Sequence, residues 1–225
     1  MSEVASEFTP SALHASVERR RGARHLTLMR VGLIHCREGK EFCLIRNLSS
    51  GGLMAQTYRR SRPGEEVHVE LTTGHILVGD VVWARGLDIG VQFRGSIDVS
   101  SVLSTRWGPE FARRPRLPRL SLSCPASVRH GSLPFTVQVQ NISQHGAKIV
   151  ATQLIPNLTS MVLSLPNLPV IEGTVRWSRG DEAGLFFKGS LPFPVLARWV
   201  DGRRQLERST ASTDSLSFDA RRLEK

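Results

Sequence analysis

The sequence predicts an all-β fold made of two tandem six-stranded antiparallel β-barrels, each followed by a short helix. Three observations lead to this prediction. The chain has 225 residues, which is enough for two small domains. It repeats itself at one fixed offset, and each repeat contains six short apolar segments separated by turn residues. Regularly spaced short strands of this kind are typical of barrels and sandwiches.

The repeat is visible in two blocks. Residues 47–52 (NLSSGG) recur as residues 141–146 (NISQHG), and residues 79–93 (GDVVWARGLDIGVQF) recur as residues 173–187 (GTVRWSRGDEAGLFF), in both cases 94 residues later. Blocks aligned at one offset indicate a tandem duplication. We therefore predict a flexible leader and a flexible tail around two domains, with the bounds 1–18, 19–108, 109–204 and 205–225.

Each copy contains apolar segments that alternate or run for a few residues between turn signals such as Arg62-Pro63-Gly64. The strands expected in the first copy are 26–36, 41–47, 52–57, 66–72, 76–84 and 89–93. Those expected in the second are 122–130, 134–141, 146–151, 160–165, 169–177 and 183–187. Short helices are expected over 97–105 and 193–200. Four aromatic residues at equivalent places are interpreted as barrel core rather than base-stacking platforms: Trp83, Phe93, Trp177 and Phe187.

Composition excludes several functional classes. No apolar stretch approaches the ~20 residues of a membrane helix, and the first residues lack the basic-then-apolar order of a secretory signal, so we expect a cytoplasmic protein without a membrane span. The cysteines Cys36, Cys43 and Cys124 form no CxxC pair, and the histidines are scattered. We therefore expect no metal site and no cofactor. The formal net charge of +10 favours an anionic partner.

Two short motifs point to that partner. Arg20 and Arg24 form an RxxxR pair, and Asn47, Ser49 and Gly52 follow as NxSxxG. Together with the GxVxW…GVxF block at 79–93, they resemble the RxxxR…(D/N)xSxxG signature of PilZ domains. The resemblance covers nearly all of 19–105 and, more loosely, 113–200. It implies a β-barrel that binds the bacterial second messenger cyclic di-GMP and passes the signal on through conformation or partners.

The residue types suit this ligand. Cyclic di-GMP carries two phosphodiesters and two guanines, and an arginine fork can bind either a phosphate or a guanine O6/N7 edge bidentately. In an extended segment Arg20 and Arg24 would lie about 13 Å apart on one side. Asn47 offers an amide, Ser49 a hydroxyl, and Gly52 a close backbone approach. NxSxxG is also ordinary turn chemistry. No base is paired with a nucleophile, so we expect no enzyme.

The second copy keeps Asn141, Ser143 and Gly146 but alters the arginines. When Arg24 is aligned with Arg119, Pro115 stands where the first copy has Arg20. The second barrel is therefore expected to be degenerate and to act as a scaffold, a homodimer surface or a contact for a protein effector.

The leading hypothesis is a cyclic di-GMP receptor that transmits the signal through ligand-induced ordering of the Arg-rich segment. One alternative is an adaptor of the same fold that binds proteins and no nucleotide. A second alternative is a general RNA or DNA binder that exploits the net charge. The absence of an aromatic-rich RNA motif from the sequence disfavours this nucleic-acid binder.

Overall fold

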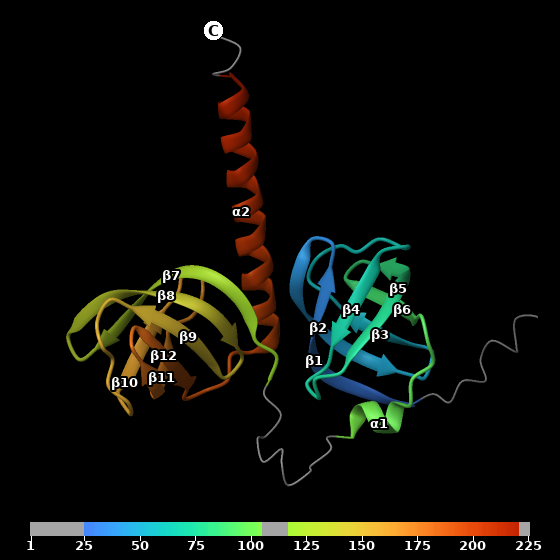
Figure 1. Cartoon of the computed structure of the whole chain (residues 1–225), viewed down its shortest axis with the longest axis horizontal. Helices are drawn as coiled ribbons and strands as arrows, with labels where there is room; N and C mark the ends of the chain where they lie inside the picture. Colours follow the sequence, from blue (N-terminus) through green and yellow to red (C-terminus); the bar gives the residue numbers. More distant parts are fainter. Residues whose placement is uncertain (1–24, 105–116, 221–225) are drawn as a thin grey trace, which may run out of the picture.

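A computed structural model of the chain describes residues 25–104 and 117–220. These residues form two closed barrels of six antiparallel strands, which lie on either side of the C-terminal helix α2 (Figure 1). The predicted fold class is therefore confirmed. The predicted leader of residues 1–18 and the arginines Arg20 and Arg24 lie outside the described residues.

The first barrel, called barrel 1, contains β1 (His25–Cys36), β2 (Gly39–Leu48), β3 (Gly52–Gln56), β4 (Glu66–Glu70), β5 (Ile76–Arg85) and β6 (Asp88–Phe93). The strands are ordered β1-β2-β3-β6-β5-β4, and pairing of β1 with β4 closes the barrel. Alternate apolar side chains fill the interior, as period-2 patterning requires. The short helix α1 (Val99–Leu103) follows, and Val99 and Val102 pack against this core.

The second barrel, called barrel 2, repeats the topology. It contains β7 (Leu120–His130), β8 (Leu133–Ser143), β9 (Gly146–Ala151), β10 (Ser160–Ser164), β11 (Ile171–Arg179) and β12 (Glu182–Phe187), with β7 paired to β10. Even the irregularities recur. The register shifts after Ile45 and Val81 in barrel 1, and 94 residues later after Val139 and Val175 in barrel 2.

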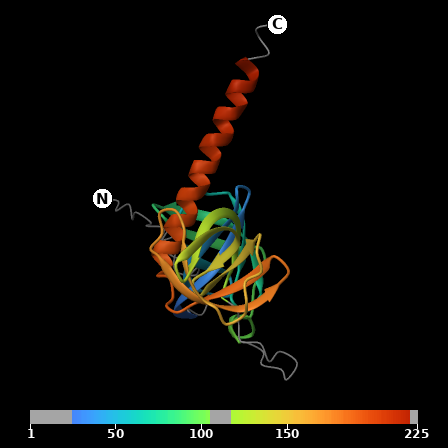
Figure 2. The same ribbon diagram turned by 90° about the vertical axis from the view of Figure 1, so that its left-hand side faces the viewer.

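The helix after barrel 2 is longer than the sequence suggests. Where a short helix over 193–200 and a flexible tail from 205 are predicted, α2 runs from Phe193 to Ala220 (Figure 2). Beyond Gly202 the segment has no proline or glycine, so nothing in it breaks a helix. The helix is also supported by contacts four residues apart: Gln205 Nε2 donates to Asp201 Oδ2 at 2.7 Å, and Arg203 lies 3.5 Å from Glu207.

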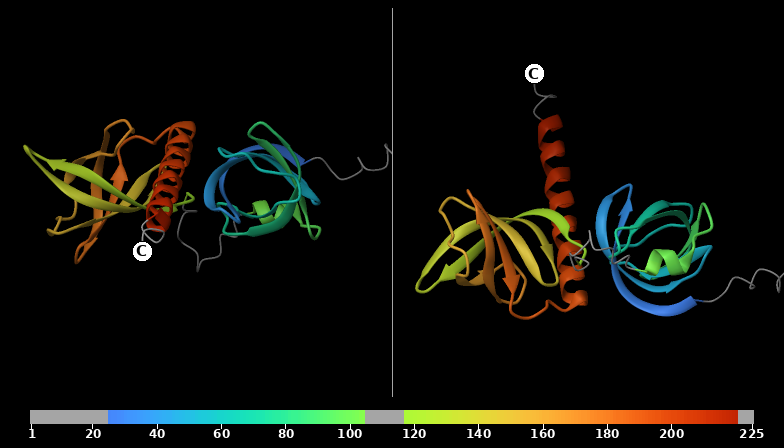
Figure 3. Two further views of the ribbon diagram at one scale, coloured as in Figure 1. Left: turned by 90° about the horizontal axis from the view of Figure 1, so that it is seen from above. Right: turned by 60° about the horizontal axis from the view of Figure 1, so that its bottom comes forward.

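The first turns of α2 contact barrel 1. The ring of Phe193 meets Phe42 edge-to-face at 6.1 Å and Tyr58 at 5.7 Å. Leu33 and Phe42, paired across β1 and β2, are 3% and 2% exposed and belong to the hydrophobic cluster of barrel 2. These two side chains of barrel 1 are therefore buried against the neighbouring domain, and Figure 3 shows α2 between the barrels from two further directions.

The interpretation of the four repeated aromatics is half right. Phe93 and Phe187 are buried in the two cores. The prediction is wrong for the two tryptophans. Trp83 lies over Gly90 and Trp177 lies over Gly184, in each case a strand glycine seven residues later. A Cβ on either glycine would lie 2.0 Å from the indole Nε1. The register shift after Val81 and Val175 turns each tryptophan to the outer surface, which simple alternation does not reveal.

Candidate functional site

The NxSxxG segment forms the turn between β2 and β3, called the β2–β3 hairpin. Asn47 follows a β-bulge, where Ile45 pairs with Ala55 and Asn47 with Met54. Because the bulge inserts one residue, Ile45 and Leu48 both point into the core while the side chain of Asn47 is exposed. The bulge therefore presents the amide of Asn47 to solvent.

Ser49 and Gly52 build the turn itself. The Ser49 hydroxyl donates to the Gly52 carbonyl oxygen at 3.0 Å, and the Ser49 backbone N–H donates to the same oxygen at 2.8 Å. A Cβ on Gly52 would lie 2.4 Å from the carbonyl oxygen of Val91 on β6, so only glycine fits. Both residues thus have a structural role that accounts for their presence in either copy of the motif.

Barrel 2 has the same turn between β8 and β9. The Ser143 hydroxyl donates to the Gly146 carbonyl oxygen at 3.2 Å, and a Cβ on Gly146 would lie 2.5 Å from the Leu185 carbonyl oxygen. Folding therefore explains why the degenerate copy keeps Ser143 and Gly146.

The strand register identifies the counterpart of Arg24. His25 pairs with Leu48 in barrel 1, and Leu120 pairs with Ile142 in barrel 2. Arg119, which precedes Leu120, therefore corresponds to Arg24, which precedes His25 in the sequence. The guanidinium of Arg119 donates from Nη1 to Asn141 Oδ1 at 3.0 Å. An arginine at this position thus reaches the asparagine of the motif.

The structure brings three of the five predicted site residues together. Asn47, Ser49 and Gly52 share one hairpin, and Asn47 pairs with Thr27 at the beginning of β1. The hairpin therefore lies beside the strand that directly follows Arg24. The positions of Arg20 and Arg24 themselves lie outside the described residues.

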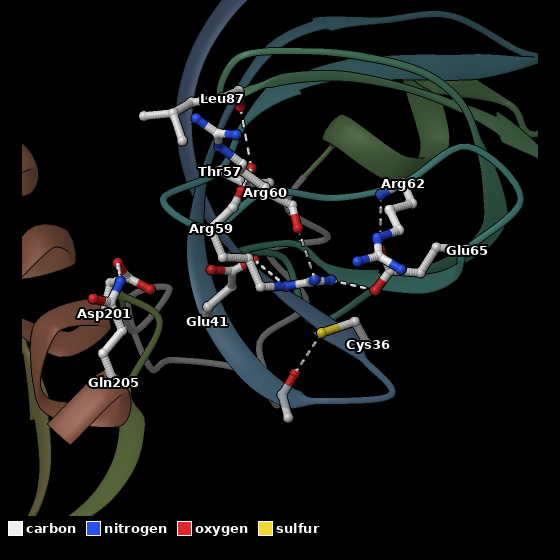
Figure 4. A network of polar contacts seen from close by, with 11 residues as sticks. Cys36, Glu41, Thr57, Arg59, Arg60, Arg62, Glu65, Leu87, Asp201 and Gln205 are labelled. Carbon is white, nitrogen blue, oxygen red and sulfur yellow. Dashed lines mark hydrogen bonds and ion pairs between the residues drawn. The ribbon is translucent and has the colours of Figure 1, made fainter. Parts of the chain in front are cut away.

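A second polar network lies on the side of barrel 1 that faces α2 (Figure 4). Arg59, whose side chain is 11% exposed, forms ion pairs with Glu41 at 3.1 Å and with Glu65. The sequence places Arg59 in a basic loop with Tyr58, Arg60 and Arg62 that we interpret as solvated. For Arg59 this is wrong, because its acidic partners come from β2 and from the loop before β4.

Burial makes the carboxyl of Glu41 an unusually weak acid. Loss of solvation raises the pKa of its carboxyl to about 7, although Arg59 and Arg204 of α2 act in the opposite direction and Asp201 of α2 adds to the rise. Burial also raises the pKa of the nearby Cys36 thiol, which donates to the Gly39 carbonyl oxygen at 3.2 Å. No sequence signal marks Glu41, because the charged groups that act on it, Arg59 of barrel 1 and Asp201 and Arg204 of α2, lie far from it in the sequence.

Other kinds of site find little support in residues 25–104 and 117–220. This part of the chain contains no group of three His, Cys, Asp or Glu side chains that could hold a metal ion. None of its helices is long and apolar enough to cross a membrane.

Comparison with known proteins agrees with the architecture. A family model described as the PilZ domain matches residues 18–104 and again residues 112–199. A search of curated proteins finds no match.

Several solved structures resemble the chain at low sequence identity. The PlzA protein of Borreliella burgdorferi in complex with c-di-GMP is 10% identical, with 76% of this chain and 86% of that chain covered and a TM-score of 0.35. The inhibitor of motility MotI/DgrA of Bacillus subtilis is 13% identical, with coverages of 81% and 99% and a TM-score of 0.31. The MrkH–c-di-GMP complex of K. pneumonia is 13% identical, with coverages of 86% and 90% and a TM-score of 0.28.

Proposed function

Because the chain belongs to the PilZ family, with two PilZ domains in tandem, we propose that it is a non-enzymatic receptor for cyclic di-GMP. The ligand binds at the first domain through Arg20, Arg24, Asn47, Ser49 and Gly52. The two guanidinium groups bind phosphate and guanine edges, Asn47 supplies an amide, and the hairpin backbone at Gly52 lies close to the ligand.

One observation carries the proposal most strongly. In barrel 2 the arginine that precedes the first strand is hydrogen-bonded to the asparagine of the motif, as Arg119 is to Asn141. The same register in barrel 1 relates Arg24 to Asn47. This relationship supports a single site formed by the two halves of the signature, which lie 23 positions apart in the sequence (24 to 47). Only the first copy contains both arginines of RxxxR.

We propose that the signal leaves barrel 1 through the segment that carries the arginines. Bound cyclic di-GMP orders residues 19–24 over the β2–β3 hairpin, and the ordered segment alters the surface that barrel 1 and barrel 2 offer to a protein effector. This is an order–disorder switch of the kind that small anionic ligands drive elsewhere. The second barrel serves as scaffold or effector contact.

Isothermal titration of the purified chain with cyclic di-GMP tests the binding. The wild type should release heat of binding, and Arg20→Ala/Arg24→Ala should abolish it, because each lost charge-assisted contact weakens binding by about 1.5–3 kcal/mol. The double variant Arg60→Ala/Arg62→Ala, at exposed arginines on another loop of barrel 1, should bind like the wild type. Equal affinity in both double variants would refute the assignment.

Trypsin cleavage tests the ordering step. The segment from Arg19 to Arg24 contains four arginines, and cyclic di-GMP should slow cleavage at these bonds in the wild type while leaving the Arg20→Ala/Arg24→Ala chain unprotected. Binding without protection would leave the receptor role standing and reject the ordering mechanism.

A protein adaptor that binds no nucleotide is the second candidate, and the altered arginines of barrel 2 favour it. Affinity capture with the Arg20→Ala/Arg24→Ala chain distinguishes the two. An adaptor would retain its partner irrespective of these arginines, whereas a receptor should gain or lose its partner when cyclic di-GMP is added to the wild type only.

A further inference from the structure

Barrel 2 has a pocket on its outer surface, with a volume of about 720 Å³, which lies within the usual range for small-molecule sites. It is bounded by residues before β7, by the end of β8 and the β8–β9 turn, and by residues of β9, β11 and β12. The side chains that matter here are Arg119, Asn141, Lys148, Arg176, Trp177 and Phe186. We call this the barrel-2 pocket.

The barrel-2 pocket is cationic. Its lining contains three basic side chains, those of Arg119, Lys148 and Arg176. No carboxylate is among the lining residues that the structure describes. Arg119 is held in place because it donates to Asn141 Oδ1, whereas the charge of Lys148 is balanced by Glu182 on the adjoining strand. Fixed cations bind an anion with little loss of side-chain entropy, so a phosphate suits this lining.

The same pocket also presents aromatic surface. Trp177 is 38% and Phe186 is 43% exposed, which is unusual for large apolar side chains of a folded domain. The guanidinium of Arg176 lies 5.0 Å from the centre of the Phe186 ring. Flat rings and a guanidinium plane offer stacking surfaces that every nucleobase can use.

Barrel 1 lacks this combination. At the positions 94 residues earlier it has Met54, Val82 and Gln92 in place of Lys148, Arg176 and Phe186. The tryptophan is common to both barrels, where it covers a strand glycine, so it has a structural role in each. Lys148, Arg176 and Phe186 are therefore particular to barrel 2. Unlike the tryptophan, they have no strand glycine to cover in the described part of this barrel.

We propose that the barrel-2 pocket binds a mononucleotide. Its phosphate lies between the guanidinium groups of Arg119 and Arg176, and its base stacks on Phe186 beside Trp177. One cationic cluster and one aromatic surface match one phosphate and one base, whereas a cyclic dinucleotide has two of each. The site does not use Arg20 or Arg24, so it is independent of the function proposed for barrel 1.

The test uses the full chain with Arg20→Ala/Arg24→Ala, which removes the arginines of the barrel 1 site. Isothermal titration with 5′-GMP, 5′-AMP, cyclic di-GMP and inorganic phosphate should detect binding of at least one mononucleotide, with phosphate weaker. Adding Arg176→Val or Phe186→Gln should weaken that binding about tenfold. Both changes install the residue that barrel 1 has at the matched position, so the strand can accommodate them, and circular dichroism checks the fold.

Arg179→Ala is the matched control, since Arg179 is an exposed arginine of the same strand β11 and is not a lining residue. It should leave mononucleotide affinity unchanged. The proposal is overturned if neither mononucleotide binds at millimolar concentration, or if Arg176→Val and Phe186→Gln bind as well as Arg179→Ala. Tighter binding of cyclic di-GMP than of both mononucleotides would also overturn it. By contrast, equal binding of cyclic di-GMP by the wild type and the Arg20→Ala/Arg24→Ala chain would refute the barrel 1 site instead.

Discussion

Arg119 Nη1 donates a hydrogen bond to Asn141 Oδ1 at 3.0 Å, which joins the residue before β7 to the end of β8. The bond connects two parts of a motif that lie 22 positions apart in the sequence (119 to 141). It forms because a β-bulge turns Asn141 away from the core, as the matching bulge does for Asn47 in barrel 1. The asparagine is therefore placed for contact with an arginine or a ligand, and the serine and glycine are placed for the turn.

These different roles predict that Asn47→Ala acts mainly on ligand affinity, whereas Ser49→Ala also lowers the stability of barrel 1. Asn47→Ala should weaken cyclic di-GMP binding about tenfold, the effect of one hydrogen bond to a charged group, and should leave the free energy of unfolding nearly unchanged because the side chain is exposed. Ser49→Ala should lower the free energy of unfolding by about 0.5–1.5 kcal/mol through loss of its bond to Gly52. Titration and urea denaturation measure the two effects. Unchanged affinity in Asn47→Ala would remove Asn47 from the site.

The close approach of the hairpin to β6 predicts that any side chain at position 52 destabilises barrel 1. In Gly52→Ala the new methyl group would meet the Val91 carbonyl oxygen at 2.4 Å, so the strands must shift, at a cost of about 1–3 kcal/mol in unfolding free energy. Gly51→Ala is the control, because a Cβ there has nothing within 4 Å and the backbone is not left-handed. Urea denaturation should separate the two variants clearly. Equal stability would mean that the hairpin and β6 are not in contact as described.

The strands and turns were predictable because they depend on local patterns. Alternating apolar residues and turn glycines define each strand, and the 94-residue repeat shows that both halves share one topology. The outward position of Trp83 was not predictable in this way, since a bulge changes which face a residue occupies without altering its neighbours in sequence.

Long-range packing explains the other differences. Arg59 stands among basic residues in the sequence, and only the closed barrel brings Glu41 and Glu65 to it. Phe42 resembles any strand residue, yet its burial depends on α2 of the other domain. Likewise, the RxxxR and NxSxxG motifs were recognisable from the sequence, whereas the three cations of the barrel-2 pocket come from three separate segments.

The aromatic contacts of Phe193 predict that removal of its partner rings separates the two domains. Phe42→Ala/Tyr58→Ala removes both rings of barrel 1 that touch Phe193, at outward positions that leave the interior of barrel 1 intact. The domains should then move apart, and small-angle X-ray scattering should report a larger radius of gyration with unchanged far-ultraviolet circular dichroism. Val82→Ala, at an exposed apolar residue of the same barrel, should leave the radius unchanged. No difference between the two chains would show that the barrels are held together by other contacts.

The raised pKa of Glu41 predicts that the stability of the folded chain depends on pH. Its pKa in the folded chain is about 7, raised by burial, against an ordinary value of 4.5. Between these pH values the unfolded chain loses the proton while the folded chain retains it, so the free energy of unfolding should fall as the pH rises from about 4.5 to about 7 and then level off. One group contributes at most about 1.4 kcal/mol per pH unit within this window.

Glu41→Gln isolates this contribution, because glutamine resembles the protonated acid and does not titrate. Glu41 faces Arg59 of its own barrel, which also pairs with Glu65, as well as Asp201 and Arg204 of α2. None of these four groups is changed by the substitution. Measured by urea denaturation, wild type and variant should be similar at pH 5, and the variant should be the more stable by about 1–3 kcal/mol at pH 8. Glu38→Gln, at an exposed carboxylate of the adjoining turn, should follow the wild type at both pH values. If the curves of wild type and Glu41→Gln run parallel from pH 5 to pH 8, the carboxyl of Glu41 does not retain its proton in the folded chain, and its pairing with Arg59 outweighs its burial.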